Sequence, residues 1–174
     1  MVIWFTGISG TGKTTLGKYF FNRFKKKNSS TIYFDGDKFR SIFKNDIKYT
    51  IKDRNTNAQR LTRLVKFLSD QKINIIISAN ITTFSFRKWC RKNIKNYLEI
   101  YIHTSKKILR KRDYKNLYKL ILKKKIKNVV GIDLPFKRPS GCSLYLNNNS
   151  SKYELFKNYE KILNLIEKRK IKVY

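Results

Sequence analysis

The stretch Gly7-Ile8-Ser9-Gly10-Thr11-Gly12-Lys13-Thr14 decides the fold of this 174-residue chain. It matches the pattern G-x-x-x-x-G-K-[ST], in which glycines let the backbone bend so that successive N–H groups point at phosphate oxygens. The apolar run Val2–Thr6 precedes it and a helix-forming run follows, so a helix N-terminus would add partial positive charge at the same point. The pattern in this setting predicts a loop that binds a nucleoside triphosphate; the alternative is a glycine turn without chemical use.

The residues of this loop have distinct expected roles. Lys13 is placed to reach the β- and γ-phosphates, and the Thr14 hydroxyl is placed to join the coordination shell of Mg²⁺. ATP and Mg²⁺ are therefore the expected cofactors. The other residues here that we expect to contact ATP are Gly7, Ser9, Gly10, Thr11, Gly12 and Thr15.

Apolar runs alternate with longer amphipathic stretches, a pattern typical of α/β folds with a mostly parallel sheet. Several runs are apolar throughout, so helices should cover both faces of the sheet. Strands are expected at Val2–Thr6, Thr31–Asp35, Ile73–Ala79, Leu98–His103 and Ser143–Leu146. Helices are expected at Thr14–Lys27, Lys38–Lys44, Asp53–Gln71, Ser85–Asn96, Ser105–Arg112 and Lys152–Lys170.

The stretch 113–141 differs from the rest of the chain. It is basic and weakly periodic, and it contains both prolines, Pro135 and Pro139. A length of 174 residues is about the size of one domain. We therefore expect a single domain, 1–174, in which residues 113–141 form a lid; a plain surface insertion is the alternative.

The net charge is strongly positive, since 41 Lys and Arg residues against 11 Asp and Glu residues give +30. One explanation is a nucleic-acid surface. The other is the bias of an AT-rich gene, which enriches Lys, Ile and Asn and leaves only Ala58 and Ala79, combined with an anionic small-molecule substrate. We favour the second because the basic residues are dispersed, and we expect no specific nucleic-acid partner.

Other sequence features bear on location. The longest apolar run, around Ile73–Ile77, is far shorter than the roughly 20 residues that span a membrane. No basic leader precedes the first apolar run, and Cys90 and Cys142 do not make a disulfide framework. We therefore expect a soluble, cytoplasmic protein without a membrane partner.

Two carboxylates, Asp35 and Asp37, follow the second expected strand in the sequence Asp-Gly-Asp. Ligands bind at the carboxyl edge of open α/β sheets. There, one carboxylate could hold Mg²⁺ while the other orients or deprotonates an attacking hydroxyl. The alternative is a turn in which the side chain caps a helix.

A second cluster begins the long helix, for which we take Asp53 as the cap. The helix sets Arg54, Asn57 and, one turn later, Arg60 near one face. Two guanidinium groups and an amide at this spacing suit a doubly charged, phosphate-like group. The alternative is an ordinary solvated helix face.

The order of these motifs resembles the adenylylsulfate (APS) kinase family. The matching stretches are the loop 7–14, Asp35-Gly-Asp-x-x-Arg40, Tyr49-x-x-x-Asp-Arg-x-x-Asn-x-x-Arg60, 112–119 and 128–135, within a resemblance that runs from about Val2 to Asn147. It implies a three-layer P-loop NTPase sandwich with a helical or loop lid. It also implies an ATP-dependent kinase that transfers the γ-phosphate to the ribose 3′-hydroxyl of a nucleotide with a mixed anhydride at its 5′ end.

The resemblance assigns further roles. It places Asp37 in the position of the catalytic base and implies Lys13 as the second catalytic residue. It also implies that Asp37 and Thr14 organise the metal and that Arg112 binds ATP. It implies a small-molecule nucleotide acceptor as partner and a homodimer as the assembly. The implied acceptor-binding residues are Asp35, Arg40, Tyr49, Arg54, Asn57, Ile81, Thr82, Lys115, Val129, Gly131 and Ile132.

The departures from the family pattern cluster on the acceptor side. The family sandwiches the acceptor adenine between two phenylalanines; Tyr49 stands at the first position and Val129 at the second. The family's Ile-Ser-Pro-x-Arg becomes Ile81-Thr-Thr-Phe-Ser85. Since the ATP side is unchanged, we expect the same chemistry on a smaller base, as in the cytidine diphosphoramidate kinases of capsule phosphoramidate synthesis; adenylylsulfate is the alternative acceptor.

Two other classes stay open. A P-loop kinase of another small metabolite would not need Tyr49 or the Asp-Arg-x-x-Asn run. A nucleic-acid-binding protein would use the positive charge, and its binding would be site-specific and resist physiological salt.

Overall fold

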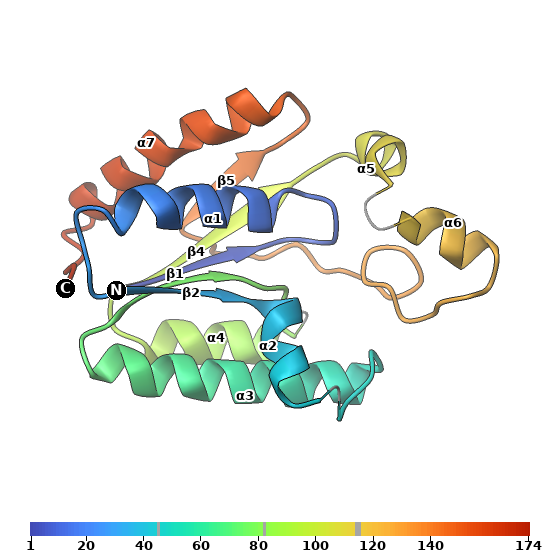
Figure 1. The fold of residues 1–174 in the computed structure, drawn as a ribbon, viewed down its shortest axis with the longest axis horizontal. Helices are drawn as coiled ribbons and strands as arrows, with labels where there is room; N and C mark the ends of the chain where they lie inside the picture. Colours follow the sequence, from blue (N-terminus) through green and yellow to red (C-terminus); the bar gives the residue numbers. More distant parts are fainter. Residues whose placement is uncertain (45, 82, 114–115) are drawn as a thin grey trace.

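The computed structural model describes residues 1–44, 46–81, 83–113 and 116–174. Within them, parallel strands form a five-stranded sheet in the order β2-β3-β1-β4-β5 (Figure 1). The strands are β1 (Val2–Thr6), β2 (Thr31–Asp35), β3 (Asn74–Ser78), β4 (Tyr97–His103) and β5 (Leu144–Asn147). The helices are α1 (Lys13–Phe24), α2 (Gly36–Ile42), α3 (Ile51–Asp70), α4 (Phe84–Asn93), α5 (Lys106–Arg112), α6 (Leu117–Leu122) and α7 (Lys152–Lys168).

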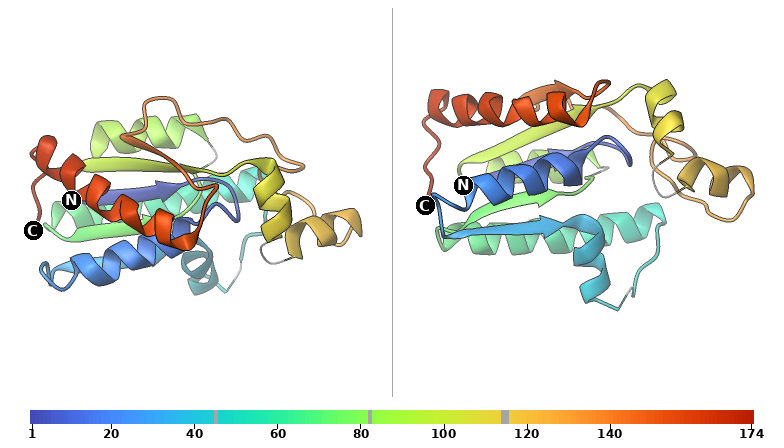
Figure 2. Two further views of the ribbon diagram at one scale, coloured as in Figure 1. Left: turned by 90° about the horizontal axis from the view of Figure 1, so that it is seen from above. Right: turned by 45° about the horizontal axis from the view of Figure 1, so that its top comes forward.

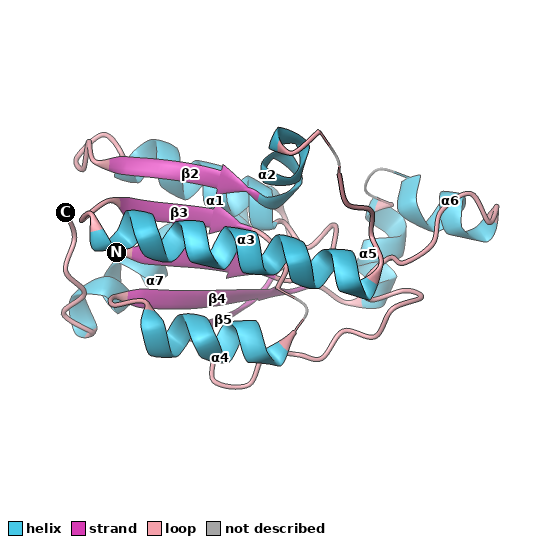
Figure 3. Cartoon of the chain, turned by 90° about the horizontal axis from the view of Figure 1, so that it is seen from below, coloured by secondary structure: helices cyan, strands magenta, loops and turns pink. Residues whose placement is uncertain are grey.

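Helices cover both faces of the sheet, α1 and α7 on one and α3 and α4 on the other (Figures 2 and 3). Strand β1 is apolar throughout because its side chains enter the cores on both faces of the sheet. Ile3 and Phe5 join the core beneath α1 and α7, whereas Val2 and Trp4 join the core beneath α3 and α4. Alternate side chains of one strand thus serve two cores. The predicted three-layer α/β sandwich with a parallel sheet is confirmed.

The sheet order places the functional motifs together. In β1, β2 and β3, which are parallel, the carboxyl ends lie at one edge, and Asp35 at the end of β2 pairs with Ser78 at the end of β3. The loop 7–12 leaves β1 at this edge and leads into α1, and residues 79–81 leave β3 there. This edge is where ligands bind in open α/β sheets.

Helix α3 begins two residues before the expected start. Thr50, not Asp53, is its N-cap: the Thr50 Oγ1 accepts from the Asp53 N–H at 3.2 Å, and the Asp53 carboxylate accepts from the Thr50 N–H at 3.3 Å and from its hydroxyl at 2.7 Å. This is a capping box, in which the acid sits at the third helical position. The expectation that Asp53 itself caps the helix is wrong, although it contributes to the cap.

Two further helices differ from expectation, one in its start and one in its presence. Helix α2 begins at Gly36 rather than Lys38, because the Asp35 carboxylate caps it. Within the stretch expected to be a lid, residues 117–122 form α6, a helix that weak periodicity did not predict. None of the helices in the described part of the chain is long and apolar enough to cross a membrane.

Replacing Thr50 by alanine removes the side-chain half of the capping box, and we expect it to lower the free energy of unfolding by about 1 kcal/mol. Chemical denaturation measures this. Thr56→Ala is the matched control, because the Thr56 hydroxyl contacts only the Lys52 carbonyl within the helix, where alanine is the better helix former. Equal destabilisation in both variants would contradict the assignment of the cap.

Candidate active site

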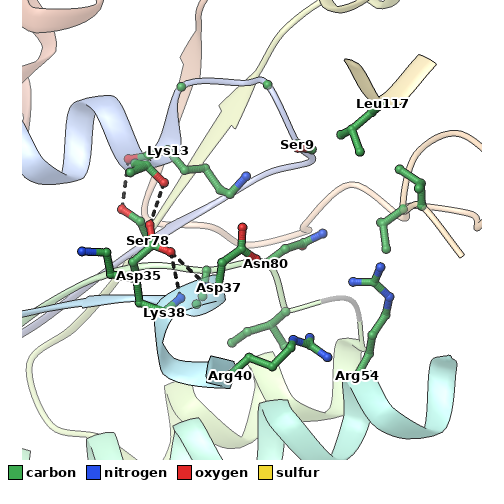
Figure 4. Close-up of a pocket in the computed structure, with 18 of the residues that line it drawn as sticks. Ser9, Lys13, Asp35, Asp37, Lys38, Arg40, Arg54, Ser78, Asn80 and Leu117 are labelled. Carbon is green, nitrogen blue, oxygen red and sulfur yellow. Dashed lines mark hydrogen bonds between the residues drawn. The ribbon is translucent and has the colours of Figure 1, made fainter. Parts of the chain in front are cut away.

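A cleft of about 1080 Å³ opens at the carboxyl edge of the sheet. It is lined by the phosphate loop, the start of α2 and of α3, the segment after β3, and parts of residues 112–130 and 148–155. Figure 4 shows side chains from these elements facing one another across it.

The phosphate loop takes the shape that its glycines allow. Gly7 has φ 147° and Gly12 has φ 93°, and a Cβ on Gly12 would lie 2.7 Å from Nδ2 of Asn148. The Lys13 ammonium donates to the Ile8 carbonyl at 2.8 Å, so this side chain folds back along the loop. α1 begins at Lys13, which directs its first N–H groups toward the cleft.

Asp35 caps a helix, which is one of the two readings that its sequence left open, and it also binds the Thr14 side chain. Its Oδ2 accepts from the Thr14 hydroxyl at 2.9 Å, which ties β2 to the first turn of α1. Its Oδ1 accepts from the backbone N–H groups of Asp37 at 3.0 Å and Lys38 at 3.4 Å, which caps α2. The cap directs Asp37, an exposed residue of the first turn, into the cleft.

Three oxygen-bearing side chains, those of Thr14, Asp35 and Asp37, border the same part of the cleft. Among the described residues, no group of three or more His, Cys, Asp or Glu residues could hold a metal by itself. Mg²⁺ prefers oxygen ligands and is bound through one or two protein groups together with substrate phosphates. The donor set fits Mg²⁺ bound with ATP, rather than a metal that the protein holds alone.

Arg40, Tyr49 and Arg54 form the opposite wall. The Arg40 guanidinium lies 4.6 Å from the centre of the Tyr49 ring, and that of Arg54 lies 5.5 Å from it. Arg54 also donates to the Tyr49 carbonyl at 3.0 Å and to the Asn128 carbonyl at 2.6 Å, which fixes its position between two segments. Burial, and then the charge of Arg40, lowers the pKa of Arg54. The two guanidinium groups make this wall a site for an anion.

Polar groups in this half of the cleft lack protein partners. Arg40 Nε, Asn57 Oδ1 and Asn80 Oδ1 are buried and make no hydrogen bond with any residue that the structure describes. Buried polar atoms are normally paired, and leaving them unpaired costs about 1–3 kcal/mol each. These atoms point to a ligand rich in hydrogen-bonding groups.

Arg112 and Asn148 brace the phosphate loop. Arg112 donates to the carbonyls of Gly10, Asn148 and Ser150 at 3.2–3.4 Å. The Asn148 amide donates to the Thr11 carbonyl at 2.9 Å, and its backbone carbonyl accepts from the Thr104 hydroxyl. Sequence reasoning missed Asn148, because nothing in its local pattern shows that it reaches a loop 137 residues away.

The predicted site residues fall into three groups: those away from the cleft lining, those outside the described residues and those that line the cleft. Gly7, Thr11, Gly131 and Ile132 do not line the cleft; for example, the Thr11 hydroxyl donates to the Ile8 carbonyl, and Gly131 packs against the Ile8 side chain. Thr82 and Lys115 lie outside the described residues. The residues that do line it are Ser9, Gly10, Gly12, Lys13, Thr14, Thr15, Asp35, Asp37, Arg40, Tyr49, Arg54, Asn57, Ile81, Arg112 and Val129.

Arg60 lies away from the cleft, contrary to its expected place beside Arg54 and Asn57. Its guanidinium pairs with the Asp46 carboxylate at 2.8 Å and covers the Phe43 ring at 4.6 Å. The interpretation of Arg60 as a third phosphate-facing group is therefore wrong, because a loop carboxylate provides its partner.

Residues 1–147 match the sequence model of the family described as adenylylsulphate kinase. The chain belongs to the adenylylsulfate kinase family. A cytidine diphosphoramidate kinase from Campylobacter jejuni is 38% identical over 148 residues, which are 85% of this chain and 86% of that protein. An adenylyl-sulfate kinase from Buchnera aphidicola is 30% identical over 168 residues, 95% of this chain and 80% of that protein.

A solved structure supports the same membership. The Mycobacterium tuberculosis APS kinase CysC, in complex with AMPPNP and APS, superposes with a TM-score of 0.84 at 27% identity and covers 95% of this chain and 96% of its own. Like its relatives, this adenylylsulfate kinase family member is an ATP-dependent phosphotransferase.

Asn148→Ala removes the side-chain support of the phosphate loop, and we expect ATP affinity to fall about tenfold, the value of one well-placed hydrogen bond to the loop. Isothermal calorimetry with a non-hydrolysable ATP analogue measures this. Asn158→Ala is the matched control: its buried amide donates within α7, to the Leu155 and Glu154 carbonyls, and its loss should reduce stability alone. Unchanged ATP affinity in Asn148→Ala would contradict a contribution of Asn148 to ATP binding.

Proposed function

We propose that this chain transfers the ATP γ-phosphate to the ribose 3′-hydroxyl of a nucleotide whose 5′ end is a mixed anhydride, and that the nucleotide is cytidine diphosphoramidate. The observation that carries the proposal is the position of Asp37. Its carboxylate enters the cleft between the phosphate loop and the anion-binding wall of Arg40 and Arg54. A hydroxyl held there would face the terminal phosphate of ATP.

The proposed chemistry follows from this placement. Lys13 and the first N–H groups of α1 bind the β- and γ-phosphates. Asp37 accepts the proton of the acceptor hydroxyl while that oxygen forms a bond to the γ-phosphorus. The bond from this phosphorus to the bridging oxygen breaks, and ADP leaves. Mg²⁺, held by Thr14 and Asp37 with Asp35 beside them, would neutralise charge on the phosphates.

Arg40 and Arg54 would bind the charged 5′ end of the acceptor. Both guanidinium groups are fixed by backbone carbonyls, Arg40 by that of Lys48 and Arg54 by those of Tyr49 and Asn128. A fixed guanidinium loses little side-chain entropy when an anion binds, and its fork suits phosphoryl oxygens. Positioning and charge neutralisation, rather than covalent catalysis, would supply most of the rate.

The base-binding region supports a pyrimidine. Tyr49 is half exposed and offers an aromatic surface, whereas Val129, which also lines the cleft, is aliphatic. Stacking on an aromatic ring is worth about 1–3 kcal/mol per base, so the loss of one ring disfavours a purine that needs both. The similarity to the Campylobacter jejuni cytidine diphosphoramidate kinase supports the same assignment.

Adenylylsulfate is the second candidate acceptor. It is favoured by the match to the APS kinase bound to APS and by several adenylyl-sulfate kinases at 28–34% identity. The chemistry of transfer would be the same with either nucleotide.

We also propose that residues 116–141, within the lid expected at 113–141, close over both nucleotides. Leu117, Leu120 and Ile126 line the cleft from this segment. Asp133 organises the middle of this segment, where its carboxylate accepts from the N–H groups of Asn128 and Val129. Closure would exclude water from the transferring phosphate.

An acceptor panel tests the substrate assignment. Cytidine diphosphoramidate and adenylylsulfate are offered with ATP, ADP release is followed, and phosphorus NMR locates the new phosphoryl group. We expect a higher kcat/KM with cytidine diphosphoramidate and a product phosphorylated at the 3′ position. Equal or faster turnover of adenylylsulfate would make adenylylsulfate the assigned acceptor. A sugar or other small metabolite as the best acceptor would contradict both nucleotide assignments.

Asp37→Ala tests the catalytic role. We expect kcat to fall by at least about 100-fold, the lower range for loss of a general base, while the ATP dissociation constant changes little. Asp70→Ala is the control, because this exposed carboxylate pairs with Lys66 on α3, outside the cleft. Turnover that survives in Asp37→Ala would contradict the mechanism.

A further inference from the structure

Asn80 is a cleft residue for which the family resemblance gave no role. It lies two residues beyond the end of β3 and lines the cleft. Its Oδ1 is buried and accepts no hydrogen bond from any residue within the described ranges. Because an unpaired amide oxygen is costly inside a protein, a ligand that donates a hydrogen bond here would remove that cost.

Strand register brings the segments that carry Asp37 and Asn80 side by side. Asp35 pairs with Ser78 across β2 and β3. Gly36 approaches Ala79 so closely that a Cβ on Gly36 would lie 2.8 Å from the Ala79 Cβ. Asp37 follows in the first turn of α2 and Asn80 follows in the segment after β3; both line the cleft, and Figure 4 shows them on the same side of the pocket. A ligand group adjacent to the one that Asp37 holds is therefore within reach of Asn80.

The chemistry of a ribose acceptor identifies the ligand group that would face Asn80. On ribose, the 2′- and 3′-hydroxyls are cis on neighbouring carbons, so a 3′-hydroxyl at Asp37 brings the 2′-hydroxyl beside it. The hydroxyl can donate to an amide oxygen, which stays neutral and does not compete with Asp37 for the proton. Asn57, the other amide here with an unpaired oxygen, lies on α3 one turn from Arg54 and so borders the charged end instead.

We propose that Asn80 binds the 2′-hydroxyl of the acceptor ribose and makes the site selective for ribonucleotides. This inference rests on the proposed function only in requiring a nucleotide acceptor whose 3′-hydroxyl faces Asp37. It is independent of the base and of the 5′ end group.

The test compares each acceptor with its 2′-deoxy counterpart, using whichever of cytidine diphosphoramidate and adenylylsulfate the chain phosphorylates. In the unchanged protein we expect kcat/KM to be at least about tenfold higher for the ribonucleotide, the value of one hydrogen bond. In Asn80→Ala the ratio should fall to near one, through loss of activity on the ribonucleotide alone. In Asn80→Asp the ratio should persist, because a carboxylate oxygen still accepts from the hydroxyl.

Asn55→Ala is the matched control. The Asn55 amide oxygen accepts from the Thr83 hydroxyl at 2.5 Å, so this variant disturbs the same segment after β3 from outside the cleft. Its ratio should equal that of the unchanged protein. Thermal unfolding of each variant confirms that the fold is retained.

The outcomes separate the two proposals. A ratio near one in the unchanged protein, a ratio that survives in Asn80→Ala, or an equal loss on both sugars would overturn the role of Asn80 and leave the proposed function intact. If neither nucleotide is phosphorylated, the proposed function fails and the role of Asn80 fails with it.

Discussion

The hydrogen bond from the Thr14 hydroxyl to the Asp35 carboxylate is the contact on which the site depends. Asp35 ends β2, and Thr14 lies in the helix that follows β1. Since β3 lies between β2 and β1, this hydrogen bond reaches across one strand of the sheet. The Ser78 hydroxyl at the end of β3 donates to the Lys13 carbonyl at 3.0 Å and completes the link. The ends of β2 and β3 are thereby tied to the first turn of α1 beside the phosphate loop, and Asp37 follows directly in the cleft.

The contiguous motifs could be predicted from the sequence because their function is encoded in neighbouring residues. A glycine-rich loop of this pattern between an apolar strand and a helix usually binds phosphate. The order of the five apolar runs likewise indicates an α/β fold. The places of Asn80 and Asn148 in the cleft could not be predicted, since the first depends on how β2 and β3 pair and the second on a contact between residues 137 positions apart. Arg60 had the expected helical spacing, yet its partner Asp46 comes from a loop that periodicity does not describe.

Acidic side chains are scarce in this chain, with 11 against 41 basic ones, and several of them have specific structural tasks. Asp53 closes the cap of α3, and Asp133 holds the turn at residues 128 and 129. Glu99 is buried on β4 and pairs with Arg91 at 3.0 Å; burial raises the pKa of Glu99, and Arg91 counteracts this. The absence of a specific nucleic-acid partner stays a prediction.

Arg54 joins two segments that are far apart in the chain, the backbone at Tyr49 and the backbone at Asn128. The consequence concerns protein engineering. The wall of Arg40, Tyr49 and Arg54 cannot be transferred by moving residues 36–60 alone, since Arg54 is oriented in part by the Asn128 carbonyl, which this segment does not contain. A chimera meant to exchange substrate preference between relatives must therefore carry residues 126–134 together with the start of α3, or Arg54 will lose one of the two anchors that hold it.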